Sequence, residues 1–239
     1  MYSNKERYTY MSKQFWGILI AIVVIFFGVV LINNHKSDNQ SASNAKPTHH
    51  VEGNTASNVT LVEYGDYQCP VCESFYSATK QTEEKYKDQI AFQFRNLPLS
   101  SMHPNAFAAA RAAEAAGLQG KFWQMHDTLY DAQNYQEWAY DASSGAVTSS
   151  DPTSFFNAYA KQLGLNLTKF DKDMKSAKVN NAINADLAAF KKTGDEEATP
   201  TYYLNGKKLD NQKLVGSDGT PNVDAFSKVI DAALAAQKK

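Results

Sequence analysis

The chain has 239 residues, with 24 Lys and Arg against 25 Asp and Glu, so its formal charge is −1 at neutral pH. Because general nucleic-acid binding depends on a strongly cationic face, this balance argues against a nucleic-acid partner. Hydrophobic residues make up 43% of the chain, enough for a core, and the mean hydropathy is negative, so global disorder and a multi-span membrane protein are both excluded.

The first predicted element is an apolar segment near the N-terminus. Residues Phe15–Ile32 carry no charge, and eighteen helical residues rise about 27 Å, close to the thickness of the bilayer core. Three positively charged residues precede the segment. By the positive-inside rule, these charges place residues 1–14 in the cytoplasm and the residues after the segment outside it. We predict an uncleaved single-pass anchor in the cell membrane. The alternative, a cleaved signal peptide, is less favoured because the segment is longer than an ordinary signal core.

A polar segment follows the predicted anchor. Residues 33–58 consist mainly of Asn, Ser, Lys, His, Asp and Thr, with little that a core would bury, so we predict a flexible linker. Adjacent His49 and His50 are the residue type that binds metals, but the segment supplies no partner ligands. We therefore interpret them as solvated.

The remaining residues, 59–239, show strand and helix patterns of one extracytoplasmic domain. The pattern predicts strands over Val59–Tyr64 and Ile90–Asn96, on either side of a helix over Pro70–Tyr86. Helices are then expected over Asn105–Leu118, Lys121–Asp131, 150–163 and Leu167–Lys192, followed by a β-hairpin over Thr201–Leu209 and a last helix over Val223–Gln237. This order predicts an α/β fold with a block of helices inserted between its strands.

Both cysteines lie where the first strand of this domain gives way to its first helix. Cys69 is placed at the helix N-terminus, where unpaired N–H groups and the helix dipole favour a thiolate over a thiol. A thiolate is the nucleophile, and also a good leaving group, in disulfide exchange. Cys72 lies on the same helix face, within reach to close a disulfide, and Pro70 suits the first helical position.

This Cys-x-x-Cys motif has three alternative interpretations. A structural zinc site needs four ligands, but the chain has no other cysteine, and His103 and His126 stand alone. A structural disulfide is less favoured, since closing so small a loop removes little unfolded-chain entropy. Chance is the third. The expected extracytoplasmic address and the strand-to-helix position favour redox chemistry, with no metal and no organic cofactor.

Several stretches of the chain resemble one family. The sequences VEYGDYQCPVC and ATPTYYLNG, with FRNLPL, HPNA and GKFWQMHDTLY between them, are similar to the DsbA-like thioredoxin-fold oxidoreductases, especially the membrane-anchored Gram-positive type. The resemblance covers Val59 to Ala235. It implies a thioredoxin fold with an inserted helical domain over about residues 100–195, reduced exported proteins as substrates, and a quinone-linked membrane partner that reoxidises the enzyme.

The resemblance also implies roles for residues of this chain. Pro200 matches the cis-proline that faces the disulfide, and Thr199 would present its backbone to an extended substrate peptide, beside Pro70 and Val71. An ordinary proline at the start of a strand is the alternative interpretation of Pro200. One departure is Ala198, where many relatives carry Gly.

Glu63, six residues before Cys69 in an otherwise apolar strand, matches the family's buried acid. Burial should raise its pKa, and its role would be to accept or relay the proton of Cys72. A charge that faces solvent from the strand is the alternative. Arg95, on the second strand, is either a partner of Glu63 or solvated, and the sequence does not decide between the two.

Val71 is informative because it is uncharged. Strongly oxidising members of the family carry His between the cysteines, and valine supplies neither a cation nor a donor, so we expect a less oxidising couple. Together these features predict an extracytoplasmic thiol-disulfide oxidoreductase that introduces disulfides into exported proteins. A reductase or isomerase of the same fold, and a non-catalytic peptide-binding module, stay open as alternatives.

Overall fold

A computed structural model describes residues 45–140, 147–148 and 150–237 of the chain. The predicted cytoplasmic segment, the predicted anchor over Phe15–Ile32 and the first part of the predicted linker lie outside these residues. None of the helices within the described ranges is long and apolar enough to span a membrane.

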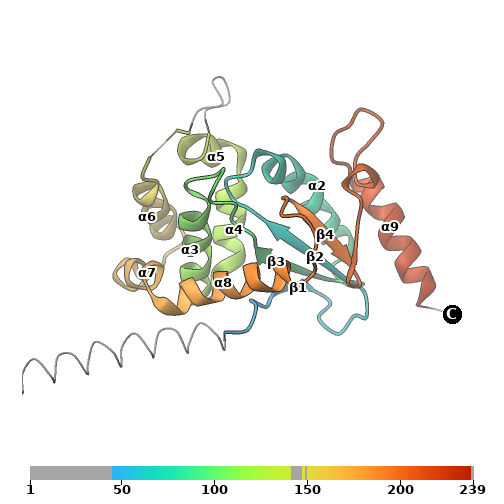
Figure 1. The fold of residues 1–239 in the computed structure, drawn as a ribbon, viewed down its shortest axis with the longest axis horizontal. Coiled ribbons are helices and arrows are strands. Elements are labelled where there is room, and N and C mark those ends of the chain that lie inside the picture. Colours follow the sequence, from blue (N-terminus) through green and yellow to red (C-terminus); the bar gives the residue numbers. More distant parts are fainter. Residues whose placement is uncertain (1–44, 141–146, 149, 238–239) are drawn as a thin grey trace, which may run out of the picture. The chain divides into compact units, whose positions relative to one another are not determined.

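A five-stranded mixed sheet forms the centre of the domain (Figure 1). The strands are β1 (His50–Gly53), β2 (Thr60–Gly65), β3 (Ala91–Asn96), β4 (Thr201–Leu204) and β5 (Lys207–Lys208), in the spatial order β1-β3-β2-β4-β5. Strands β2 and β3 pair in parallel, with Glu63 opposite Phe94 and Tyr64 opposite Arg95, while the other pairs are antiparallel. The predicted hairpin is confirmed: Asn205 and Gly206 both have positive φ, at 50° and 77°, as a tight turn between β4 and β5 requires.

Helices α2 (Pro70–Tyr86) and α9 (Val223–Ala236) cover one face of this sheet. Phe75 of α2 and Phe226 of α9 both contact the ring of Tyr202 on β4, with centroids 5.9 and 5.3 Å away. The opposite face packs against α8 (Ala177–Lys191), where Phe190 meets Tyr64 edge-on at 5.0 Å. Because successive strand residues point to opposite faces, Glu63 faces α2 while its neighbour Tyr64 faces α8.

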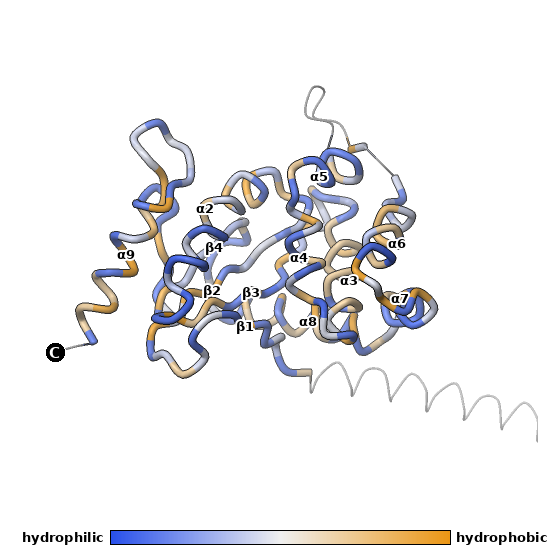
Figure 2. Tube along the Cα trace, turned by 180° about the vertical axis from the view of Figure 1, so that it is seen from behind, coloured by the Kyte–Doolittle hydropathy of each residue, from blue (hydrophilic) through white to orange (hydrophobic). Residues whose placement is uncertain are grey.

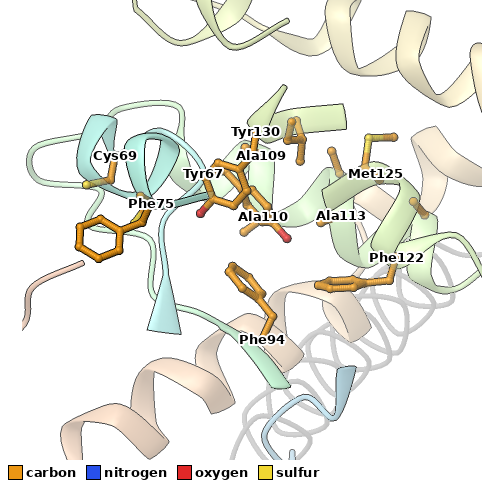
Figure 3. Close-up of a cluster of buried hydrophobic side chains, with 14 of the residues drawn as sticks. Tyr67, Cys69, Phe75, Phe94, Ala109, Ala110, Ala113, Phe122, Met125 and Tyr130 are labelled. Carbon is orange, nitrogen blue, oxygen red and sulfur yellow. The ribbon is translucent and has the colours of Figure 1, made fainter. Parts of the chain in front are cut away.

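A block of helices is inserted between β3 and β4. It comprises α3 (Ala106–Gly117), α4 (Phe122–Tyr130), α5 (Ala132–Trp138), α6 (Thr153–Gln162), α7 (Leu167–Met174) and α8. Helix α3 is mostly alanine, shown in the tan of apolar residues in Figure 2, and its buried small side chains let neighbouring helices approach closely. One buried cluster joins this block to the sheet, and it includes Tyr67, Phe94, Phe122 and Tyr130 (Figure 3). The predicted α/β fold with a helical insertion is confirmed.

The folded domain begins before residue 59, so the predicted extent of the flexible linker is wrong. Strand β1 pairs with β3, and the His50 imidazole stacks on the Phe122 ring at 3.4 Å while its Nε2 lies 2.8 Å from Glu114 Oε1. His50 is therefore packed rather than solvated. Just before it, buried Thr48 donates hydrogen bonds to Asp186 from its N–H and its hydroxyl, each at 2.7 Å. Hydrogen bonds to residues far away in the sequence therefore hold residues 48–50 in the folded domain.

The helices differ from the prediction in two places. The single helix expected over Leu167–Lys192 is broken into α7 and α8, because Ser176 leaves helical geometry and its side chain accepts from Val179 N–H at 3.2 Å as the N-cap of α8. Helix α5 was not predicted. It begins after Asp131, whose carboxylate accepts from the N–H groups of Gln133 and Asn134.

Candidate functional site

The Cys-x-x-Cys motif lies where the sequence placed it, at the opening of α2. Cys69 is the N-cap residue, with extended φ and ψ of −73° and 121°, and Pro70 takes the first helical position, where no N–H is needed. The Cys69 N–H donates to the Asp66 carbonyl at 3.0 Å, which fixes the turn between β2 and α2. Both thiols are free; Cys69 is 5% exposed and Cys72 is 1% exposed, so Cys72 is the deeper of the two.

The surroundings shift the pKa values of the two thiols in opposite directions. A hydrogen bond from the Cys72 thiol is the main reason that the pKa of Cys69 falls to about 6, against the opposing effect of burial. The Thr199 side chain and the N–H groups of Cys72 and Val71 lower that pKa further. Burial, with the same hydrogen bond, raises the pKa of Cys72 well above its usual value. The backbone amides that the sequence analysis emphasised therefore contribute, but the partner cysteine contributes more.

A loop from the far end of the chain completes the site. The Thr199–Pro200 peptide bond is cis, and the Cys69 thiol donates to the Thr199 carbonyl at 3.4 Å. The loop is anchored on both sides of that bond: Asn211 Nδ2 donates to the Pro200 carbonyl at 2.8 Å, and the Thr201 hydroxyl donates to the Ala198 carbonyl at 2.6 Å. The two motifs that the resemblance linked, far apart in sequence, thus meet at one sulfur.

The residues between the cysteines remain accessible. Pro70 and Val71 are both exposed, and Val71 retains 47% of its surface although it is apolar. Cys69 is buried behind them, between the start of α2 and the Thr199 carbonyl. An incoming group would therefore approach Cys69 past an apolar, uncharged rim.

Glu63 is buried beneath the site, which excludes a solvent-facing charge. Its exposure is 4%, and burial raises its pKa to about 8, assisted by the charge of Cys69 and opposed by a hydrogen bond with Tyr202. The Tyr202 hydroxyl also lies 2.8 Å from the hydroxyl of Thr79 on α2. Arg95 is not a partner of Glu63, since it lies on the opposite sheet face and donates to Tyr64 at 3.2 Å.

A buried polar network surrounds the turn before Cys69, and it was not predicted from the sequence. Asp66, 1% exposed, accepts three hydrogen bonds with its carboxylate: from Gln68 N–H and Leu99 N–H, each at 2.8 Å, and from His103 Nδ1 at 2.6 Å. This network ties the turn before Cys69 to the loop before α3. The motifs DYQC and HPNA contained its signal, because they supply Asp66 and His103, but nothing in the sequence paired them.

Gln68 extends this network toward the helical block. Its side-chain oxygen accepts from Asn105 N–H at 2.6 Å, and its carbonyl accepts from the Tyr135 hydroxyl at 2.7 Å. Gln68 is fully buried, so these bonds replace the water that it gave up. Among residues 45–140, 147–148 and 150–237, no group of three His, Cys, Asp or Glu side chains is arranged to hold a metal ion.

Comparison with known proteins identifies the family. The model of a family described as Thioredoxin matches residues 45–232. The chain belongs to the thioredoxin family. The matched range begins before β1, in agreement with the folded domain starting earlier than residue 59.

Curated relatives contain the thioredoxin-like part as a fraction of a longer chain. The chain is 37% identical over 161 residues to a protein named Na(+)/H(+) antiporter NhaA 1 of Mycolicibacterium gilvum (strain PYR-GCK), covering 66% of this chain and 24% of that protein. A protein of the same name from Salinispora arenicola (strain CNS-205) is 32% identical over 191 residues, covering 78% and 25%. The chain thus spans about a quarter of the length of these relatives.

Solved structures share the fold. A thioredoxin-like oxidoreductase from Silicibacter pomeroyi DSS-3 matches with a TM-score of 0.60 and 23% identity, covering 81% of this chain and 95% of that one. Oxidised BdbD from Bacillus subtilis matches with a TM-score of 0.61 and 22% identity, covering 80% and 97%. For alpha-DsbA1 from Wolbachia pipientis the values are 0.59 and 17%, covering 83% and 100%. At these identities the likeness establishes the thioredoxin-like fold.

Proposed function

We propose that this thioredoxin-family protein is a DsbA-like thiol-disulfide oxidoreductase that oxidises the thiols of exported proteins. The observation that carries the proposal is the contrast between the two sulfurs: the pKa of Cys69 is lowered to about 6, while that of Cys72, three residues away, is raised. A pair of this kind has one thiolate that attacks or leaves and one thiol that stays protonated. A passive peptide-binding module has no need of this contrast.

The exchange follows from these properties. In the oxidised enzyme a substrate thiolate attacks Cys69, so a substrate–Cys69 bond forms, the Cys69–Cys72 bond breaks, and Cys72 leaves and takes up a proton. A second substrate thiolate then attacks the substrate sulfur of this mixed disulfide and releases Cys69. Two electrons have passed from the substrate to the enzyme. Of the two protons that the substrate thiols lose, one remains on Cys72 and one goes to water, because Cys69 leaves as a thiolate.

Glu63 and the cis-proline loop have distinct roles in this scheme. Since burial holds the pKa of Glu63 near 8, its carboxyl group exchanges protons in the pH range in which Cys72 must gain and lose one. Thr199 offers backbone beside the sulfur, which suits an extended peptide. Pro200, with the exposed Pro70 and Val71, forms the contact surface around that peptide.

The setting in the cell is part of the proposal. An apolar segment over Phe15–Ile32 anchors the domain to the cell membrane with its thioredoxin-like part outside the cytoplasm, where disulfides persist. A quinone-linked membrane protein accepts the two electrons and regenerates the disulfide. The sequence supports the anchor through its length and its flanking charges.

The proposal is tested by trapping the intermediate. Cys72→Ser removes the resolving thiol. The Cys69 thiolate of this variant should displace thionitrobenzoate from a single-cysteine peptide that carries it as a mixed disulfide, so a peptide–Cys69 disulfide should accumulate, visible by mass spectrometry. Cys69→Ser is the matched control and should form no such adduct. Absence of the adduct in the Cys72 variant would refute exchange chemistry.

Direction is decided by the equilibrium potential of the cysteine pair against glutathione. A potential near about −120 mV is that of an oxidase, whereas one near about −270 mV is that of a reductase. The second value would contradict the oxidising role while leaving exchange itself intact.

A further inference from the structure

A histidine from outside the Cys-x-x-Cys motif stands at the opening of α2. His103 lies in the loop between β3 and α3, and its Nδ1 is 2.6 Å from Asp66 Oδ2. Both residues are buried, with 8% of His103 and 1% of Asp66 exposed. A hydrogen bond to a carboxylate fixes the orientation of a buried imidazole and favours its charged form.

The partner of His103 is also the residue that positions Cys69. The Asp66 carbonyl accepts the hydrogen bond from Cys69 N–H, and the Asp66 carboxylate accepts from Gln68 N–H. His103 is therefore joined through one residue to the backbone of the nucleophile. A second link runs through the loop itself, since His103 N–H donates to the Leu99 carbonyl and Leu99 N–H donates to Asp66.

The charges around His103 favour its protonated form. The hydrogen bond to Asp66 raises the pKa of His103 against the opposing effect of burial, and the negative charges of Asp66 and Cys69 raise it further. The titratable groups facing the imidazole are thus Asp66 from the turn before α2, Cys69 from the start of α2, and Tyr140 after α5, whose ring is 6.2 Å away edge-on. Electrostatic coupling is reciprocal: a thiolate that stabilises the imidazolium is stabilised by it equally.

We propose that His103 is a positioning residue for disulfide exchange: Asp66 holds its imidazolium beside the opening of α2, where the positive charge favours the Cys69 thiolate. The inference rests on the proposed function and adds to it a source of charge outside the motif. Val71 leaves the motif without a cation, and His103 supplies one from a neighbouring loop. When the bond between the substrate sulfur and Cys69 breaks, the departing thiolate is stabilised, so the couple is more oxidising than the motif alone predicts.

The first test needs no substitution. The pKa of His103 is measured by NMR titration of its ring protons in the intact protein, once with the cysteines reduced and once as the disulfide. Forming the disulfide removes the Cys69 charge but leaves Asp66 in place. The proposal predicts a higher pKa of His103 in the reduced protein. Equal values in the two states would overturn it.

The second test is the variant His103→Gln, with His49→Gln as the matched control, because His49 is exposed and its contact is with Gln93. In the His103 variant, the midpoint of the pH dependence of Cys69 alkylation should rise by about half a unit or more, and the reduction potential should become more negative. The control should keep both wild-type values. A folded His103 variant with unchanged midpoint and potential would overturn the proposal.

Two further outcomes are separable. If His103→Gln fails to fold, as judged by circular dichroism, the NMR comparison on the intact protein decides the question. If the Cys72→Ser variant forms no mixed disulfide while His103 titrates differently in the two redox states, the proposed function is refuted and the coupling between His103 and Cys69 stands.

Discussion

Replacing Glu63 by Gln tests the buried acid beneath the cysteines. Because burial raises the pKa of Glu63 from 4.5 to about 8, the folded protein binds a proton here that the unfolded chain has lost. Stability contributed by this difference falls as pH rises, from about pH 4.5 to about pH 8, since the folded state then binds more protons than the unfolded state. Between pH 4.5 and pH 7, ionisation of Glu63 in the unfolded chain therefore lowers the free energy of unfolding. This span of about 2.5 pH units corresponds to about 3 kcal/mol.

Glu63→Gln keeps the size and hydrogen-bonding capacity of the side chain but cannot ionise. We expect the variant and the wild type to have similar unfolding free energies at pH 4, and the variant to be more stable by about 3 kcal/mol at pH 7. Cys69 titrates in the same range and is present in both proteins, so most of its contribution cancels in their difference. Its coupling to Glu63 does not cancel, but it is smaller than the effect of burial on the pKa of Glu63. The assay is urea denaturation of the reduced proteins at several pH values from 4 to 8.

The matched control is Glu84→Gln, which removes a mostly exposed carboxylate, paired with Lys87, from the same helix and is measured over the same pH series. A stability difference for Glu63→Gln that does not grow between pH 4 and 7 would show that the carboxyl is solvated or paired. The account of its burial, and its proposed role in proton transfer with Cys72, would then fail together.

Three further predictions concern other parts of the domain. Gly65→Ala would place a Cβ 2.4 Å from the buried ring of Phe94, so urea denaturation should show a loss of about 1–3 kcal/mol; an unchanged unfolding midpoint would contradict the packing described. Asp131→Ala removes the N-cap of α5 and should cost about 1 kcal/mol by the same assay, and Asp131→Asn should retain most of it. Val71→His adds a donor and potential cation beside Cys69, so the reduction potential should become more positive, and a lower potential would count against the electrostatic reasoning.

The elements that carry the chemistry were predictable because their signals are local. The apolar and aromatic residues of β2 and β3, the strand-to-helix position of Cys69 and the Asn-Gly turn at 205–206 are each features of a few neighbouring residues. Helix α2 was predicted with its observed bounds, since Pro70 marks its start. A resemblance was still needed to bring Pro200 to the site, because no local pattern records which distant loop meets a sulfur.

What could not be predicted depends on contacts between residues far apart in sequence. Strand β1 is short and polar, and it exists because β3 offers an edge and because Thr48 and His50 find partners on α8 and α3. The break between α7 and α8 was hidden by continuous helical periodicity, which Ser176 interrupts as a cap. In the same way, Asp66 and His103 look like ordinary loop residues until the fold sets them 2.6 Å apart.

The central claim is that Cys69 is a stabilised thiolate, and the pH dependence of its alkylation tests this most directly. Reduced wild-type protein is pulsed with iodoacetamide at pH 4 to 10, and labelling at Cys69 and Cys72 is read separately by peptide mass spectrometry. A midpoint for Cys69 near pH 6, with Cys72 unlabelled over most of the range, is the predicted result. A Cys69 midpoint near 8.5, the value of an ordinary thiol, would contradict it.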